Sequence, residues 1–263
     1  MTPNAEFSIL GRAARRRRGA TPAARRASRL SHGGGADGAM LVAGVAHELR
    51  TPLTILKGRL HGLEDGVIAS SNGEAGRLLR QVEHLLRIVG DLNILTPAGG
   101  ANLTLERRLV DLGDLLGPLV ADLRAVLGTR GVRFVETYAP ALVHGDPVRL
   151  VQIFTNLLTN AIKHAPRDCE VGVSVSVTGP WIVARILDEG PGFAPGDEAL
   201  LFTPFWRADA NQDAGRPGAG LGLSLAAKLA QAHGGRIKAE NRSDRSGASF
   251  FVWLPLVCSA AEV

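Results

Sequence analysis

Residues 40–60 read MLVAGVAHELRTPLTILKGRL and decide the first part of the fold. Apolar side chains recur along this stretch at steps of three and four residues, at Leu41, Val45, Leu49, Leu53, Leu56 and Leu60. That spacing is typical of a helix with one apolar face. The pattern fades at 62–66, so the sequence predicts an amphipathic helix that starts at Met40 and ends near Gly62.

A second helix is predicted after a turn at 67–73, where Ser, Asn and Gly supply the loop chemistry. Its apolar residues follow a near-heptad spacing, at Leu78, Val82, Leu85, Val89 and Leu92, and Pro97 ends it. Two amphipathic helices joined by a short loop form an antiparallel hairpin, which alone buries too little surface to be stable. A second copy is the simplest partner, so we predict a homodimer built on a four-helix bundle.

The chain that follows a linker at 98–103 mixes helices and strands. Helices are predicted at 112–127, 147–165 and 221–232, and strands at 132–137, 141–144, 171–177, 181–187, 236–239 and 248–254. Asp146 is the expected cap of the helix that begins at Pro147. Helices and mostly antiparallel strands make a two-layer α/β sandwich, so the predicted fold class is α+β.

Three regions result: a basic arm at 1–39, a helical domain at 40–100 and the sandwich at 101–263. The arm holds eight Arg against two acids, whereas the remainder holds 22 Lys and Arg against 23 acids. Because the basic excess belongs to an arm that reads as a solvated leader, nucleic acid is not expected as the main partner. No stretch reaches the roughly 18 uncharged apolar residues of a membrane span. Two cysteines far apart in the sequence fit a reduced compartment, and we expect a cytoplasmic protein.

The first helix carries His47 away from the apolar positions Val45, Leu49 and Leu53, so this side chain is expected to be exposed. Near neutral pH an imidazole keeps a nitrogen lone pair that can attack phosphorus. Glu48 is adjacent and can accept or orient the other ring proton. A surface histidine alone is weak evidence of function, so the argument depends on its neighbours.

The helix at 147–165 carries a polar face made of Asn156, Asn160, Lys163 and His164, which are spaced by about one turn. Carboxamide oxygens are ligands that Mg²⁺ accepts together with water and substrate phosphates. A lysine supplies positive charge for those phosphates. The alternative is a set of asparagines that only cross-link a polar helix face.

Two glycine-rich segments follow in the sequence. Asp188 comes directly after an apolar strand and can accept a hydrogen bond from an amino group such as that of adenine, and Gly190 and Gly192 allow close approach of a ligand to the backbone. The second segment opens the last long helix with Gly218, Gly220, Leu221, Gly222 and Leu223. Glycines at a helix N-terminus expose amide donors that can hold phosphate. Each segment alone can equally be a turn or a hinge without a ligand.

Residues 47–53, His-Glu-Leu-Arg-Thr-Pro-Leu, resemble the phosphoacceptor motif of the sensor histidine kinases of two-component systems. The asparagine helix, the two glycine segments and residues 202–207 resemble the nucleotide motifs of the same family, in the same order. The resemblance covers 40–257. It implies that His47 is phosphorylated, that Glu48 is the general base and that Thr51 positions water for dephosphorylation of the partner.

The resemblance also implies a role for each nucleotide-site residue. Asn160 would bind Mg²⁺ with support from Asn156, and Lys163 and His164 would reach the phosphates or ribose. Asp188 would bind adenine, and the backbone from Gly218 to Leu223 would hold the phosphates beneath a lid at 194–219.

The predicted function is therefore an ATP- and Mg²⁺-dependent histidine kinase that transfers the phosphoryl group to an aspartate of a response regulator. Three alternatives are kept: another ATPase of the same superfamily, a basic adaptor that binds nucleic acid through its arm, and a member that acts mainly as a phosphatase.

Overall fold

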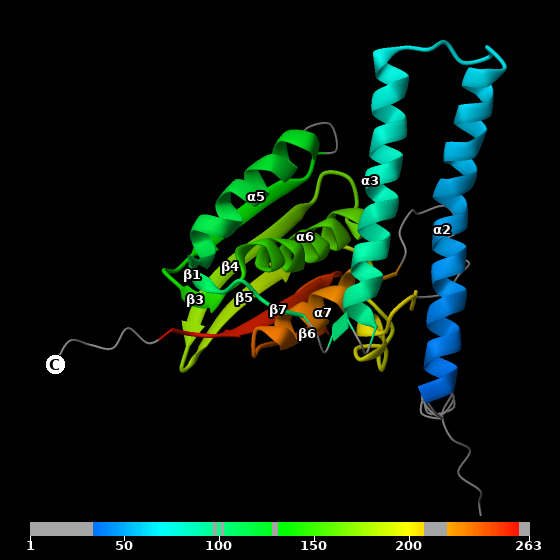
Figure 1. Cartoon of the computed structure of the whole chain (residues 1–263). Helices are drawn as coiled ribbons and strands as arrows, with labels where there is room; N and C mark the ends of the chain where they lie inside the picture. Colours follow the sequence, from blue (N-terminus) through cyan, green and yellow to red (C-terminus); the bar gives the residue numbers. More distant parts are fainter. Residues whose placement is uncertain (1–33, 97–98, 101–102, 128–130, 208–219, 258–263) are drawn as a thin grey trace, which may run out of the picture.

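The computed structural model describes residues 34–96, 99–100, 103–127, 131–207 and 220–257. The expected arm therefore lies almost wholly outside the described residues. Two regions stand beside each other in Figure 1, a long helical hairpin and a sheet covered by helices. The α+β class with a helical hairpin followed by a two-layer sandwich is confirmed.

The hairpin consists of α2 (Gly34–Glu64) and α3 (Asn72–Leu95). Helix α2 begins six residues before the expected start at Met40, because apolar periodicity marks the buried face of a helix and not its first turn. Helix α3 begins where the side chain of Ser71 accepts the N–H of Glu74, at 3.3 Å. The same N–H also donates to the carbonyl of Ser71 at 3.0 Å, so the hydroxyl adds a second acceptor at the helix N-terminus.

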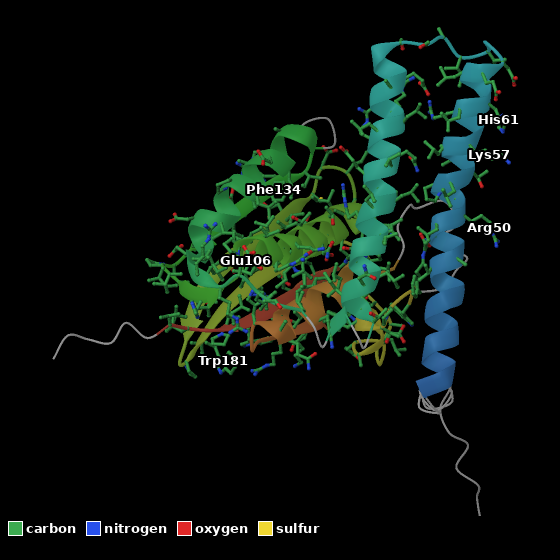
Figure 2. All side chains as sticks on the ribbon, in the orientation of Figure 1. Arg50, Lys57, His61, Glu106, Phe134 and Trp181 are labelled. Atoms are coloured by element: carbon green, nitrogen blue, oxygen red, sulfur yellow. The ribbon has the colours of Figure 1, made fainter. Side chains whose placement is uncertain are left out.

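A buried carboxylate ties the two helices together near the connecting loop. Glu74 is only 3% exposed and accepts from Arg59 of α2 at 2.6 Å and from Arg77 of α3 at 3.0 Å. The hydrogen bonds from Arg59 and Arg77 lower the pKa of Glu74, so the carboxylate stays ionised. The side chains of Arg50, Lys57 and His61 project from the face of α2 that is turned away from α3 (Figure 2).

The apolar residues of α3 form one broad stripe that is only partly covered within a single chain. Leu78, Leu85 and Leu92 are half-buried. A second row on α3, which we call the exposed seam, follows steps of three and four residues and contains Leu79, Val82, Leu86 and Val89, which are 59%, 39%, 67% and 43% exposed. Leu53, expected to face a core, is 50% exposed on α2. The apolar faces expected for the two helices are therefore covered only in part within a single chain.

The sandwich contains a five-stranded sheet of order β2-β4-β5-β7-β6. Its strands are β2 (Arg133–Tyr138), β4 (Glu170–Thr178), β5 (Trp181–Leu187), β6 (Arg236–Asn241) and β7 (Ala248–Pro255). The β2–β4 pair is parallel and the other pairs are antiparallel. Helices α5 (Leu112–Leu127), α6 (Pro147–His164) and α7 (Gly222–Ala232) form the second layer (Figure 1).

A short strand that the sequence did not reveal lies beside this layer. Strand β1 (Arg108–Asp111) pairs antiparallel with β3 (Leu142–Gly145). Four residues are too few to show alternation against the charged neighbours Arg107 and Arg108. A single 3₁₀ turn, η1 (Leu200–Phe202), also falls in the segment expected to be a lid.

Helix α6 is the centre of the sandwich core. Asp146 caps it by accepting the N–H groups of Val148 and Arg149, and Pro147 occupies the first turn as expected. One face is buried, with Leu150, Ile153, Phe154, Leu157, Leu158, Ala161 and Ile162 against the sheet and the neighbouring helices. The opposite edge of the helix is therefore left for polar side chains.

The hairpin contacts the sandwich at two places. Ile94 near the end of α3 is 7% exposed and belongs to the same core cluster, and Gln152 of α6 donates to Asp91 of α3 at 2.9 Å. On α2, Gly44 lies against the ring of Phe205, so closely that a Cβ at this position would be 2.6 Å from the ring. Among the described residues, no helix is long and apolar enough to cross a membrane.

Candidate functional site

The polar edge of α6 carries the four residues expected to face a nucleotide. Asn156, Asn160, Lys163 and His164 are all partly exposed, and the last two lie in the final turn. The side-chain nitrogen of Asn156 is buried and has no hydrogen-bond partner within the described part of the chain. A buried amide without a partner costs roughly 1–3 kcal/mol, so this donor is one that a ligand group could pair.

The start of α7 lies beside that asparagine. A Cβ built on Gly222 would be 3.5 Å from Oδ1 of Asn156, so the two segments are in contact. Gly220 adopts φ +67°, which favours glycine, and its carbonyl accepts the N–H of Phe205 at 3.0 Å. Leu221 is 3% exposed, whereas Leu223 is half-buried. Gly218 lies outside the described residues.

Asp188 lies at the end of β5 and is 3% exposed. Its Oδ1 accepts two backbone amides, from Gly190 at 2.8 Å and from Ala248 at 3.1 Å. Burial raises the pKa of this carboxyl group, and the two amides oppose that rise by stabilising the charged form. Within the described residues nothing bonds to Oδ2, so this oxygen can accept a proton donor of a ligand.

The glycines after Asp188 lie where a side chain would not fit. A Cβ on Gly190 would be 3.0 Å from the carbonyl oxygen of His164, which brings this loop to the end of α6. Gly192 adopts φ +71°, and a Cβ there would be 2.5 Å from Oδ1 of Asn241. The loop at 188–193 therefore joins the polar edge of α6 as one side of the same site.

The segment at 47–53, which is expected to carry the phosphoacceptor, lies on α2 and belongs to the other region of the molecule. Glu48 is half-buried and Thr51 is exposed, and the side chain of His47 is outside the described side chains. The contact between Gly44 and Phe205 falls one helical turn before His47. Residues 202–207, expected to form an aromatic motif, thus bridge the glycine segment at 220 and the helix that carries His47.

The described residues contain no group of three or more His, Cys, Asp or Glu side chains that could hold a metal ion. A divalent cation at this site would therefore depend on carboxamide oxygens and on the phosphates of a nucleotide. That donor set suits Mg²⁺, which keeps several waters and is commonly held by one or two protein ligands plus phosphates.

The turn between β6 and β7 was missed by the sequence reasoning. Asn241, Arg242 and Ser246 bond to the backbone of 188–193, about fifty residues earlier in the chain. Their turn-forming residue types signal a hairpin, but no local pattern reports which distant loop a hairpin contacts.

Two family models match the chain. Residues 39–98 match the His Kinase A (phospho-acceptor) domain, and residues 145–257 match the histidine kinase-, DNA gyrase B- and HSP90-like ATPase.

Similar proteins support both assignments. The signal transduction histidine-protein kinase BaeS of Escherichia coli is 31% identical over 216 residues, which are 82% of this chain and 46% of BaeS. The histidine kinase AdeS of Acinetobacter baumannii has a TM-score of 0.62 at 28% identity, with 81% of this chain and 98% of that chain covered. Full-length ShkA in complex with AMPPNP has a TM-score of 0.60 at 26% identity and covers 84% of this chain and 46% of ShkA.

The chain spans about half, or less, of the length of the curated relatives that come first, 46% of BaeS and 24% of the E. coli sensor protein KdpD. Both family models and these relatives agree on one assignment. The chain belongs to the sensor histidine kinases of two-component signalling.

Proposed function

We propose that this chain is an ATP-dependent protein-histidine kinase that phosphorylates its own His47 and passes the phosphoryl group to an aspartate of a response regulator. One observation carries the proposal: three separated segments adjoin along the polar edge of α6, since the loop after Asp188 lies against the backbone of His164 and the start of α7 lies against Asn156, whose buried side-chain nitrogen has no partner among the described residues. The same chain presents the 47–53 segment on a neighbouring helix. We infer domains at 40–100 for phosphotransfer and 101–263 for nucleotide binding.

The adenine end of the site is assigned to Asp188. Its Oδ1 is occupied by the amides of Gly190 and Ala248, and Oδ2 accepts the exocyclic amino group of adenine. Gly190 and Gly192 let the base approach the backbone, because a side chain at either position would collide with neighbouring atoms. A buried acceptor that must be paired favours a base with an amino group over one with a carbonyl.

The phosphate end is assigned to α6 and to the start of α7. Lys163 and His164 contribute charge and hydrogen bonds to the phosphates or ribose, and the amides at Gly218, Gly220, Leu221, Gly222 and Leu223 receive phosphate oxygens. The positive end of the helix dipole of α7 assists them. Asn160, supported by Asn156, would hold Mg²⁺, which supplies neutralisation of charge on the transferred phosphoryl group.

Phosphoryl transfer then requires His47 to reach the γ-phosphorus. A ring nitrogen forms the N–P bond while the bond between the γ-phosphorus and the bridging oxygen of ADP breaks, and Glu48 takes the other ring proton. Thr51 positions water when the same domain removes phosphate from the regulator. The protein acts mainly by holding the two reactants in line and by balancing charge.

A second copy of the chain is the proposed partner of the exposed seam. Leu79, Val82, Leu86 and Val89 recur at the spacing of a coiled-coil core and lie open along one chain. Four large apolar side chains in one row are covered in a stable protein, and the helices of a second hairpin present the same residues.

The test is incorporation of label from γ-³²P-ATP with Mg²⁺ into wild type, His47→Gln and His61→Gln. His61 lies on the same helix and is exposed, so it is a matched control. We expect acid-labile, alkali-stable label in wild type and in His61→Gln and none in His47→Gln. Label that persists in His47→Gln means that another residue is the acceptor. Wild type that binds ATP without being labelled contradicts the kinase proposal.

A further inference from the structure

The turn between β6 and β7 forms hydrogen bonds to the loop that carries Asp188. At its first end, Oδ1 of Asn241 accepts the N–H of Phe193 at 2.9 Å, and Nδ2 of Asn241 donates to the carbonyl of Phe193 at 2.7 Å. One side chain therefore satisfies both backbone groups of a single residue, as a neighbouring strand does. Gly192 leaves the room for this pairing, since any Cβ there would displace Oδ1 of Asn241.

The middle of the same loop is held by Ser246. Its hydroxyl donates to the carbonyl of Gly190 at 2.7 Å. Gly190 is also the residue whose N–H donates to Oδ1 of Asp188. The hydroxyl of Ser246 thus holds the peptide unit directly after the one whose N–H donates to the carboxylate.

The start of the loop is held by Arg242 and by β7. The guanidinium of Arg242 donates to the carbonyl of Asp188 at 3.2 Å and is itself anchored by two bonds to Asp244, at 2.7 and 3.0 Å. The Arg242 side chain is 10% exposed, so its position is fixed by packing as well as by charge. Gly247 adopts φ +136°, and a Cβ there would be 2.0 Å from the carbonyl oxygen of Asp188.

The side chains of Asn241, Arg242 and Ser246 each form a hydrogen bond to the backbone of the loop at 188–193. A loop with two glycines has many accessible conformations, and ordering it during binding would subtract from affinity. Because Oδ1 of Asp188 accepts two amides of this assembly, the carboxylate cannot rotate, and Oδ2 is held in one direction.

We propose that Asn241 and Arg242 are positioning residues that hold the Asp188 loop in its binding shape, so that the β6–β7 turn sets both the affinity and the base selectivity for adenine nucleotides. This inference rests on the proposed kinase function. The turn acts through Asp188 and contributes no group to the transfer of phosphate.

The test is the affinity of the full chain for ADP and for inosine diphosphate, in which a carbonyl replaces the amino group of adenine. Asn241→Ala removes both bonds to Phe193, and Ser243→Ala changes an exposed residue of the same turn as a control. We expect ADP to bind about tenfold more weakly to Asn241→Ala. The affinity of Asn241→Ala for inosine diphosphate should fall less, so the ratio of the two affinities should decrease. Ser243→Ala should bind both nucleotides as tightly as wild type.

A conservative variant separates positioning from general destabilisation. Asn241→Asp keeps an acceptor for the N–H of Phe193 and loses the donor, so its ADP affinity should fall between those of wild type and Asn241→Ala. In the label assay, KM for ATP should rise in Asn241→Ala while kcat at saturating ATP stays near the wild-type value. Equal losses for both nucleotides together with a lower melting temperature would reduce the turn to a structural element and overturn the inference.

Failure of this inference differs from failure of the kinase proposal. Wild type labelled at His47, with unchanged ADP affinity in Asn241→Ala, refutes the positioning role alone. Wild type that binds neither nucleotide and takes up no label refutes the proposed function.

Discussion

The helical hairpin and the sandwich bury their apolar residues to very different extents. In the sandwich, Phe154, Leu157 and Leu158 are fully buried, and the core draws on all three helices and the large sheet. In the hairpin, Leu79 and Leu86 of α3 are 59% and 67% exposed. The apolar residues of the sandwich are covered within one chain, whereas a row of apolar residues on the hairpin remains exposed. A domain that binds a small molecule can be stable alone, whereas a domain that binds a second copy depends on that copy to cover its exposed apolar face.

Each of the two regions also contains a buried polar side chain that joins separate segments of the chain. The hairpin is tied at its loop by Glu74 and by the cap of Ser71. The sandwich is tied at the end of α7 by buried His233, whose Nε2 accepts the N–H of Asp146 at 3.1 Å. The predictions below perturb one region and ask whether the other responds.

The largest effect is expected for Phe154→Ala, which empties the centre of the sandwich core. Loss of a fully buried Phe costs about 3–5 kcal/mol of unfolding free energy. All three tryptophans, Trp181, Trp206 and Trp253, belong to the sandwich, so denaturation followed by tryptophan fluorescence reports on this region. Val177→Ala, at a position that is 42% exposed, should shift the transition little. Equal shifts in the two variants would contradict the placement of Phe154 at the centre of the sandwich core.

The next effect concerns assembly. Leu86→Glu places a charge in the exposed seam and should weaken self-association by on the order of 2 kcal/mol, because a buried Leu contributes that much to an interface. Val135→Glu, at a residue of edge strand β2 that is 48% exposed, should leave association unchanged. Sedimentation equilibrium measures both. A Leu86→Glu protein that dimerises as tightly as wild type would show that the seam faces something other than a second copy.

A smaller effect is expected for Ser71→Ala, which removes the N-cap of α3. The cost is about 0.5–1 kcal/mol, since the amide of Glu74 loses its side-chain acceptor and keeps only the carbonyl of Ser71, at 3.0 Å. Hydrogen exchange should quicken at the start of α3 and remain unchanged in the sandwich. Ser70→Ala is the matched neighbour, exposed and outside the cap, and faster exchange in that variant too would argue against a specific capping role.

The smallest effect on stability is expected from protonation of His233 at acidic pH. Burial lowers the pKa of His233 further than the bond to Leu229 and the nearby Asp146 carboxylate raise it, with Arg107 adding to the decrease. The unfolded chain therefore takes up the proton first, so stability present at neutral pH is lost as the pH falls below about 6.5. Melting of the sandwich between pH 5 and 8 tests this. An unchanged acid slope in His233→Gln would assign the slope to other groups.

The sequence predicted most of the sandwich because several of its elements carry their own local signals. The Asp146 cap, Pro147 and a strict apolar period mark α6, and the predicted bounds of α5 and β5 are those of the structure. The parallel pairing of β2 with β4 was not predictable, since strand direction depends on the path of the chain between strands. Leu79 and Leu86 were missed because only one heptad row was assumed on α3.

The site divides along the same line. Asn156 and Gly222 belong to the two motifs expected at one nucleotide site, and they lie in contact in the structure. The bonds of Asn241 to Phe193 had no counterpart in any local pattern. A polar residue in a turn-forming sequence predicts a turn. It does not predict which distant segment that turn contacts in the folded chain.

The packing of Phe205 on Gly44 constrains how this kinase can be recombined. Phe205 is a bulky residue at φ +61°, a backbone conformation that its neighbours must enforce, and its ring occupies the space where any side chain at position 44 would begin. A chimera that joins this ATPase domain to another helical hairpin must therefore carry a glycine one turn before its histidine. The two modules are exchangeable only as a pair that matches at this point.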